Sequence, residues 1–106
     1  MEEEKKIENM ARIMSLLHLA RKAGRLITGR DAVLRSVNSG RAKMVLYARD
    51  YSRGAFIRFR QLTQHANIRM VALSSMAMLG KEFSSRDIGL LCLEDVNFVR
   101  GIERLL

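Results

Sequence analysis

The residues best placed to do chemistry lie in the segment 29–50, where basic side chains follow the predicted start of a helix. Arg30 and Asp31 fall in the first turn of a helix predicted over residues 28–38, and Arg35 follows about one turn later. The N–H groups at a helix start favour anions, and an arginine can donate two hydrogen bonds to a phosphate or to a guanine edge. The segment therefore predicts an anion site.

The helix over residues 28–38 has one apolar and one polar side. Val33 and Val37 are four residues apart and are predicted to face inward. Asp31, Arg35 and Asn38 follow the i, i+4, i+7 spacing of an outward stripe. This polar stripe is positioned to contact a partner.

Turn residues bound this helix and lead into a strand. Thr28 is predicted to cap the helix, and Asp31, three residues later, completes a capping-box pattern. Gly40 is predicted to end it, and Arg41 and Lys43 then flank the start of an apolar strand over 44–48. An aspartate such as Asp31 can accept hydrogen bonds from base amino groups.

No catalytic or metal-binding arrangement is visible elsewhere. His18 lies among leucines and is interpreted as structural, and His65 is too distant in sequence to share a metal with it. The single cysteine, Cys92, lies between leucines and is predicted to be a buried, inert thiol. Glu94 and Asp95 adjoin a predicted helix start, where capping explains them. We expect no catalytic residue, no metal and no cofactor.

Charge is concentrated in the middle of the chain. The net charge is +8, and residues 21–60 hold eleven Lys and Arg against two acids, whereas residues 1–8 hold four Glu and two Lys. A concentrated basic segment is typical of proteins that bind nucleic-acid phosphates, although a solvated basic face would also explain it. The basic residues are spread over several elements, which argues against a membrane surface. We expect a cytoplasmic monomer that does not contact membranes.

Hydrophobic spacing predicts alternating helices and strands. Helices are predicted over 4–23, 28–38, 53–66, about 75–81 and from 95 onward, and strands over 44–48, 68–73 and 88–93. Residues 26–27 could form either a short strand or an apolar connector. Asp50 or Ser52 is predicted to cap the third helix. This alternation predicts parallel pairing in a three-layer α/β/α sandwich. At 106 residues the chain is predicted to be one domain, 1–106, with residues 1–12 as the acidic start of the first helix. Only six aromatic residues occur, so composition and spacing favour recognition of a folded RNA or DNA backbone.

Several segments together resemble a known family. They are Leu-Leu-His-Leu-Ala-Arg-Lys-Ala-Gly-Arg-Leu-Ile-Thr-Gly at 16–29, Gly-Arg-Ala-Lys-Met-Val-Leu at 40–46, Ala48, Asp50, Leu79-Gly80 and Asp95. In this order they resemble the bacterial YlxQ-like branch of the large-subunit ribosomal protein superfamily that contains archaeal protein seven-Ae and eukaryotic protein thirty-e. The resemblance covers about residues 13–106.

The resemblance implies a four-stranded mixed sheet, with residues 26–27 as a short strand, and binding of kink-turn RNA. In kink-turn binders the glycine matching Gly29 is followed by Thr-Asn-Glu, with a lysine one turn later; these positions hold Arg30, Asp31, Ala32 and Arg35 here. The loop 84–89 matches one that covers an extruded nucleotide. The RNA-binding residues implied by resemblance and residue chemistry are Gly29, Arg30, Asp31, Arg35, Asn38, Arg41, Lys43, Ser84, Ser85, Arg86 and Ile88.

Two positions depart from the kink-turn pattern. Asp31 replaces an amide by an acceptor-only carboxylate, and Ala32 cannot accept a hydrogen bond from a guanine. Affinity is therefore predicted to come from phosphate contacts more than from base reading. The sequence predicts a non-enzymatic protein that binds bent, structured RNA, with ribosomal RNA as one candidate. Two alternatives remain: a stand-alone RNA-substrate-binding accessory of an RNA-modifying enzyme, and a basic adaptor for an acidic protein.

Overall fold

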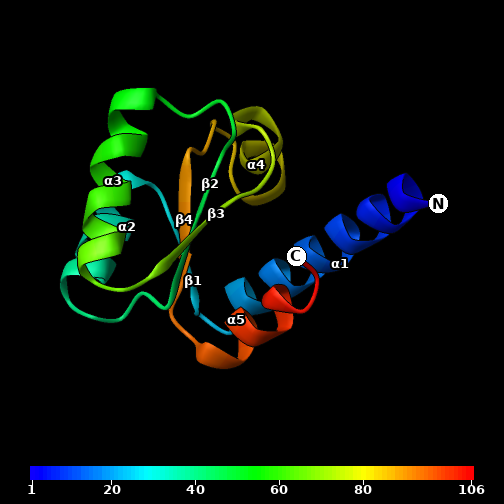
Figure 1. The fold of residues 1–106 in the computed structure, drawn as a ribbon, viewed down its shortest axis with the longest axis horizontal. Coiled ribbons are helices and arrows are strands. Elements are labelled where there is room, and N and C mark those ends of the chain that lie inside the picture. Colours follow the sequence, from blue (N-terminus) through cyan, green and yellow to red (C-terminus); the bar gives the residue numbers. More distant parts are fainter.

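Five helices and four strands alternate along residues 1–106, all of which the computed structural model describes (Figure 1). In chain order they are α1 (Glu2–Lys22), β1 (Leu26–Thr28), α2 (Arg30–Asn38), β2 (Met44–Tyr47), α3 (Arg53–His65), β3 (Arg69–Ala72), α4 (Met76–Phe83), β4 (Leu90–Leu93) and α5 (Val96–Glu103). The predicted elements are confirmed to within a few residues at their ends, and residues 26–27 belong to a strand. No helix combines the length and the apolar character needed to cross a membrane.

The four strands form one mixed sheet in the order β1-β4-β2-β3. Only β2 and β3 are parallel, while β4 is antiparallel to both of its neighbours, so the parallel pairing predicted from the alternation is wrong for two of three pairs. The reason lies in the segment after β3. The Ile88 N–H donates to the Met76 carbonyl at 3.1 Å, so the chain folds back to the start of α4 before it re-enters the sheet. A strand that enters the sheet at the end where β3 finishes must run in the opposite direction.

Helices cover both faces of the sheet and produce two core layers, which confirms the three-layer α/β/α sandwich. One layer lies under α1, α4 and α5 and includes Met44, Leu46, Leu91 and Leu93. The other lies under α2 and α3 and includes Val45, Leu90 and Cys92, among others. Successive residues of β2 and β4 therefore point into opposite layers, which explains why both strands are continuously apolar.

The start of α2 differs from the predicted capping box. Thr28 is the last residue of β1, where it pairs with Leu91, and Gly29 is the N-cap with φ +94°. No side chain caps this helix. The outward stripe on α2 is confirmed by the exposure of Asp31 and Arg35, and Val33 is fully buried on the other side.

Asp50 connects two elements instead of capping the helix that follows it. Its Oδ1 accepts from the Met76 N–H at 2.8 Å, at the start of α4. Ser52 is the N-cap of α3, with its Oγ 3.5 Å from the Ala55 nitrogen. Asp50 therefore holds the loop after β2 against α4.

The loop 84–88 packs tightly against α4. A Cβ built on Gly80 would collide with the backbone carbonyl of Arg86 and lie 2.9 Å from the Cα of Asp87. The loop is further held by the Arg86 N–H, which donates to Ser84 Oγ at 3.2 Å. Only glycine at position 80 allows the loop to approach the helix this closely.

This contact predicts opposite effects of alanine at two helical glycines. Gly80→Ala should lower the free energy of unfolding by roughly 1–3 kcal/mol, because the added methyl group overpacks a backbone contact. Gly54→Ala on α3 should be neutral or raise it by about 0.4–1 kcal/mol, because nothing lies within 4 Å of the added carbon. Urea unfolding followed by circular dichroism measures both. Equal stability of the two variants would contradict the close approach at Gly80.

Candidate functional site

The start of α2 lies beside a cavity bounded by three backbone hydrogen bonds between elements. The Gly29 N–H donates to the Leu90 carbonyl at 2.9 Å, the Ala48 N–H donates to the Gly89 carbonyl at 2.9 Å, and Ile88 bonds to the start of α4 as described above. The positive φ of Gly29 lets the chain turn sharply from β1 into α2. These links fix the α2 N-terminus against the segment before β4.

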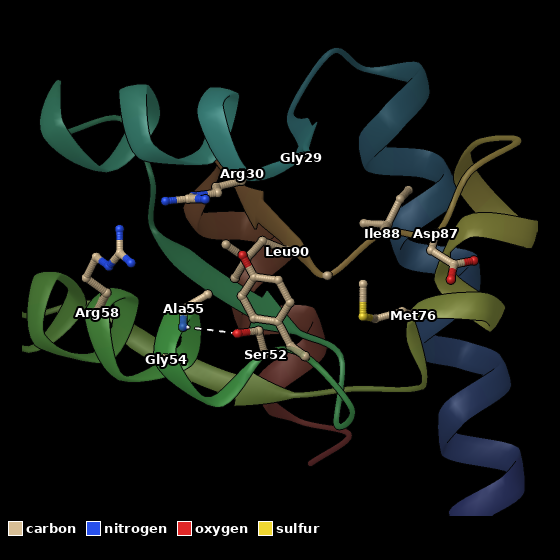
Figure 2. Close-up of a pocket in the computed structure, with 12 residues that line it drawn as sticks. Gly29, Arg30, Ser52, Gly54, Ala55, Arg58, Met76, Asp87, Ile88 and Leu90 are labelled. Atoms are coloured by element: carbon tan, nitrogen blue, oxygen red, sulfur yellow. Dashed lines mark hydrogen bonds between the residues drawn. The ribbon is translucent and has the colours of Figure 1, made fainter.

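The cavity has a volume of about 500 Å³ and opens to solvent. It is lined by Gly29, Arg30, Tyr51, Ser52, Gly54, Ala55, Arg58, Met76, Asp87, Ile88, Gly89 and Leu90. Figure 2 shows Arg30 and Arg58 at one end of the cavity and Ile88, Met76 and Asp87 at the other. The cavity thus has a cationic end and an opposite end that combines two apolar side chains with the carboxylate of Asp87.

Tyr51 contributes an aromatic ring to the cavity wall. A Cβ on Gly89 would collide with this ring, so the ring lies directly against the Gly89 backbone. Burial raises the pKa of the Tyr51 hydroxyl, and the positive charges of Arg30 and Arg58 partly offset that effect. Both arginines therefore act electrostatically on the same hydroxyl. The side chains of Arg30 and Arg58 are exposed and form no ion pair within the chain.

The N–H groups at the start of α2 are open to an external acceptor. The first N–H groups of any helix lack partners within the helix, and no side chain supplies one here. In contrast, α3, α4 and α5 are capped by Ser52, Ser75 and Asp95. Together with the neighbouring cations, this arrangement can bind an anion such as a phosphate.

The structure divides the predicted site residues into three groups. Gly29, Arg30 and Ile88 line the cavity, and Asp31 is exposed on the first turn of α2 beside it. Ile88 is only 6% exposed and its side chain also belongs to the core. Ser84, Ser85 and Arg86 are exposed on the loop next to α4 but do not line the cavity.

The remaining predicted residues lie along α2 and at the opposite end of the central strands. Arg35 and Asn38 are exposed along the helix. At that end the Lys43 N–H donates to the Leu93 carbonyl at 2.7 Å, and Arg41 Nε lies 3.6 Å from Glu94 Oε2. The charge of Arg41 is thus partly compensated. Arg41 and Lys43 lie at the other end of α2 from the cavity.

The capping role predicted for Glu94 is wrong, because the side chain that caps α5 is that of Asp95 and Glu94 forms other contacts. Its Oε2 accepts from the buried Ser36 hydroxyl at 2.5 Å and also faces Arg41, so it links α2 to the end of β4. Cys92 is buried as predicted, and burial raises the pKa of its thiol to about 11. His18 is half-exposed, and its Nε2 lies 2.8 Å from Glu82 Oε2, beside the ring of Phe83. These contacts are structural.

Several cavity residues were not predicted from the sequence. Tyr51, Ser52 and Arg58 come from the loop after β2 and from α3, and Met76 comes from α4. The basic character of α3 was visible in the sequence, but nothing in it shows which arginine turns toward α2. The Asp50 contact to α4 holds the loop that carries Tyr51.

Comparison with known proteins adds a family and a fold. The sequence model described as "Ribosomal protein L7Ae/L30e/S12e/Gadd45 family" matches residues 11–93. No match is found among curated proteins. A solved structure described as a protein with unknown function from Bacillus halodurans C is similar over 90% of this chain and 96% of that chain, with a TM-score of 0.82 and 24% identity. At that identity the likeness shows the fold alone.

The charges around Tyr51 predict a measurable titration. The Tyr51 hydroxyl should titrate above the ordinary tyrosine pKa of about 10, and Arg30→Ala or Arg58→Ala should raise its pKa further by removing a nearby positive charge. Above the ordinary value the unfolded chain loses a proton that the folded chain keeps, so stability should fall as pH rises through this range.

Absorbance at 295 nm in a Tyr47→Phe background isolates the Tyr51 titration. Arg35→Ala, one turn further along α2, is the matched control and should leave the titration unchanged. A Tyr51 that titrates at the ordinary value in the parent protein would contradict the described packing.

Proposed function

The chain belongs to the ribosomal protein L7Ae/L30e/S12e/Gadd45 family, and we propose that it is an RNA-binding protein that recognises a bent, kink-turn-like element of structured RNA. In this proposal the start of α2 and the adjacent cavity receive the bend. The protein is non-enzymatic, uses no cofactor, acts as a monomeric RNA-binding domain in the cytoplasm and belongs to the bacterial YlxQ-like branch. Ribosomal RNA is the partner most consistent with the family name.

The observation that carries the proposal is the uncapped start of α2 beside two unpaired arginines. Arg30 and Arg58 face a cavity of about 500 Å³, and the first N–H groups of α2 have no side-chain acceptor. A phosphate placed at the helix start would receive N–H donors and two guanidinium groups. Such a site suits a sharply bent RNA backbone, in which a phosphate projects away from the stacked bases of the RNA helix.

The cavity also suits an unstacked base. Its volume lies in the range of small-molecule sites, roughly 300–1,000 Å³, and the Tyr51 ring and the Ile88 side chain supply an aromatic and an aliphatic wall. Stacking of a base on an aromatic ring contributes about 1–3 kcal/mol. Tyr51 thus gives one local stacking position in a protein with few aromatic residues. The segment 84–89 would cover the extruded nucleotide, as the family resemblance implies.

Specificity is the part of the proposal that depends on two side chains. Asp31 is exposed and Ala32 is half-buried on the first turn of α2. Neither reproduces the asparagine and glutamate of kink-turn binders. Phosphate contacts from Arg30 and Arg35 would then dominate affinity, and discrimination between bent RNAs would be modest.

The first test removes two of the proposed phosphate contacts. Arg30→Ala combined with Arg35→Ala should weaken binding to a kink-turn RNA by about tenfold or more and should lower the slope of log affinity against log salt by roughly 1.5–2. Filter binding or fluorescence anisotropy at several salt concentrations gives both numbers. The matched control is Arg12→Ala on α1, whose side chain is 63% exposed and lies 4.0 Å from Glu8. If Arg12→Ala weakens binding as much as the double variant, the assigned face is wrong.

A second test restores the base-reading pattern. Asp31→Asn combined with Ala32→Glu should increase the preference for a kink-turn RNA over a plain duplex by about 1–3 kcal/mol, because one bidentate base contact contributes that much discrimination. The ratio of the two dissociation constants is the readout. An unchanged ratio with folded protein would mean that this chain reads RNA through other residues.

A further inference from the structure

The strand β3 lies at one edge of the sheet and has no strand on its outer side. It pairs with β2 alone, in parallel register from Met44↔Arg69 to Tyr47↔Ala72. An edge strand presents a row of unpaired N–H and C=O groups, and an extended peptide can add to it as a further strand. The edge of β3 is therefore open to backbone hydrogen bonding.

A groove runs beside this edge on the α3 face of the sheet. It consists of two adjoining cavities of about 420 and 370 Å³ that share Tyr47, Phe56 and Arg60 in their walls. The second cavity is also lined by Ile68 and Met70, from the start of β3 and the residue before it. The second cavity thus lies between α3 and the start of β3, and the first lies between α3 and the loop after β2.

The side-chain spacing along β3 suits an added strand. Ile68 and Met70 are two residues apart and both pack toward the α3 layer. Alternate side chains of an added strand would face the same layer about 6.6–6.8 Å apart. An inward-facing side chain of such a peptide could then enter the second cavity beside Ile68 and Met70 while the peptide backbone pairs with β3.

Part of the groove wall is apolar. The rings of Tyr47 and Phe56 lie with their centroids 4.7 Å apart at an interplanar angle of 43°. Ile57, which lines the first cavity, is 45% exposed. Apolar side chains of a partner would cover this surface.

The rim of the groove is cationic and uncompensated. Arg49, Arg53 and Arg60 line the first cavity, and none of them forms an ion pair within the chain. The Arg60 guanidinium carbon lies 6.0 Å from the centroid of the Phe56 ring. A partner that carries carboxylates between its apolar residues would match both the rim and the walls.

We propose that the open edge of β3 and the groove between β3 and α3 bind an extended acidic peptide segment of a partner protein, with its apolar side chains at alternate positions. An RNA strand could neutralise the arginines, but it could not extend the sheet by backbone pairing. The groove and the RNA cavity lie against different faces of α3, because Arg58 lines the cavity and Arg60 lines the groove. The protein would then hold RNA and a protein partner at the same time.

The test uses a fluorescein-labelled peptide of alternating valine and glutamate, nine residues long, and measures its binding to the full chain by anisotropy. Two control peptides keep the length: one groups the valines and glutamates in separate blocks, and the other replaces glutamate by lysine. The alternating acidic peptide should bind at least about tenfold more tightly than either control. Amide hydrogen exchange at Met70 and Ala72, whose N–H groups point away from β2, should slow when it binds.

Two variants of α3 with the same charge change provide the matched comparison. Arg60→Glu should weaken the alternating peptide about tenfold and leave kink-turn RNA binding unchanged, while Arg58→Glu should do the reverse. Phe56→Ala should weaken the peptide about fivefold through lost apolar contact. Circular dichroism checks that each variant is folded.

Three results would overturn the peptide site: equal binding of the alternating and block peptides, no change in exchange at β3, or a loss of RNA binding on Arg60→Glu equal to that on Arg58→Glu. The last result would instead make the groove part of the RNA surface. If Arg58→Glu leaves RNA binding intact while Arg60→Glu still weakens the peptide, the proposed RNA cavity fails and the peptide site stands.

Discussion

The insertion of β4 between β1 and β2 is the constraint on which both the fold and the candidate site depend. All four residues of β4 are at most 1% exposed, and they contribute alternately to the two core layers. Full burial of a leucine side chain contributes about 1.5–3 kcal/mol, so this strand cannot shift without a large loss. Its first residue accepts from Gly29, which fixes the start of α2 against the segment that precedes β4. The cavity forms because these two chain segments are held together at one end of the central strands.

Much of the fold follows from the sequence because burial on two faces leaves a clear pattern. The apolar runs at 44–48 and 88–93 predicted strands, and the two strands they form lie in the middle of the sheet. The polar stripe at Asp31, Arg35 and Asn38 predicted the exposed side of α2. Strand direction was not predictable in this way, because an apolar run looks the same in either direction. The family resemblance supplied the mixed sheet that the pattern alone could not.

The candidate site was predicted only in part, because it depends on contacts between distant segments. The cations of α2 were visible as a local pattern. Tyr51 and Arg58 reach the cavity from the loop after β2 and from α3, and no local pattern predicted that these segments face the start of α2. The contact of Asp50 with α4, which holds the loop carrying Tyr51, was predicted only as a local helix cap. Arg30 and Arg41 were both predicted to bind RNA. In the structure Arg30 begins α2 and Arg41 follows its end, and the nine residues of this helix span about 13 Å.

Gly29 explains why α2 has a sharp start and open N–H groups at the same time. The backbone there has φ +94° and ψ 151°, a conformation that side-chain-bearing residues rarely adopt. The residues that cap helices well, such as serine, threonine and aspartate, all carry a Cβ and would be strained at this position. The turn that joins β1 to α2 therefore excludes a good side-chain cap, and the helix start stays available to an external anion. Since the same glycine also bonds to Leu90, the open donors are held rigidly beside the cavity.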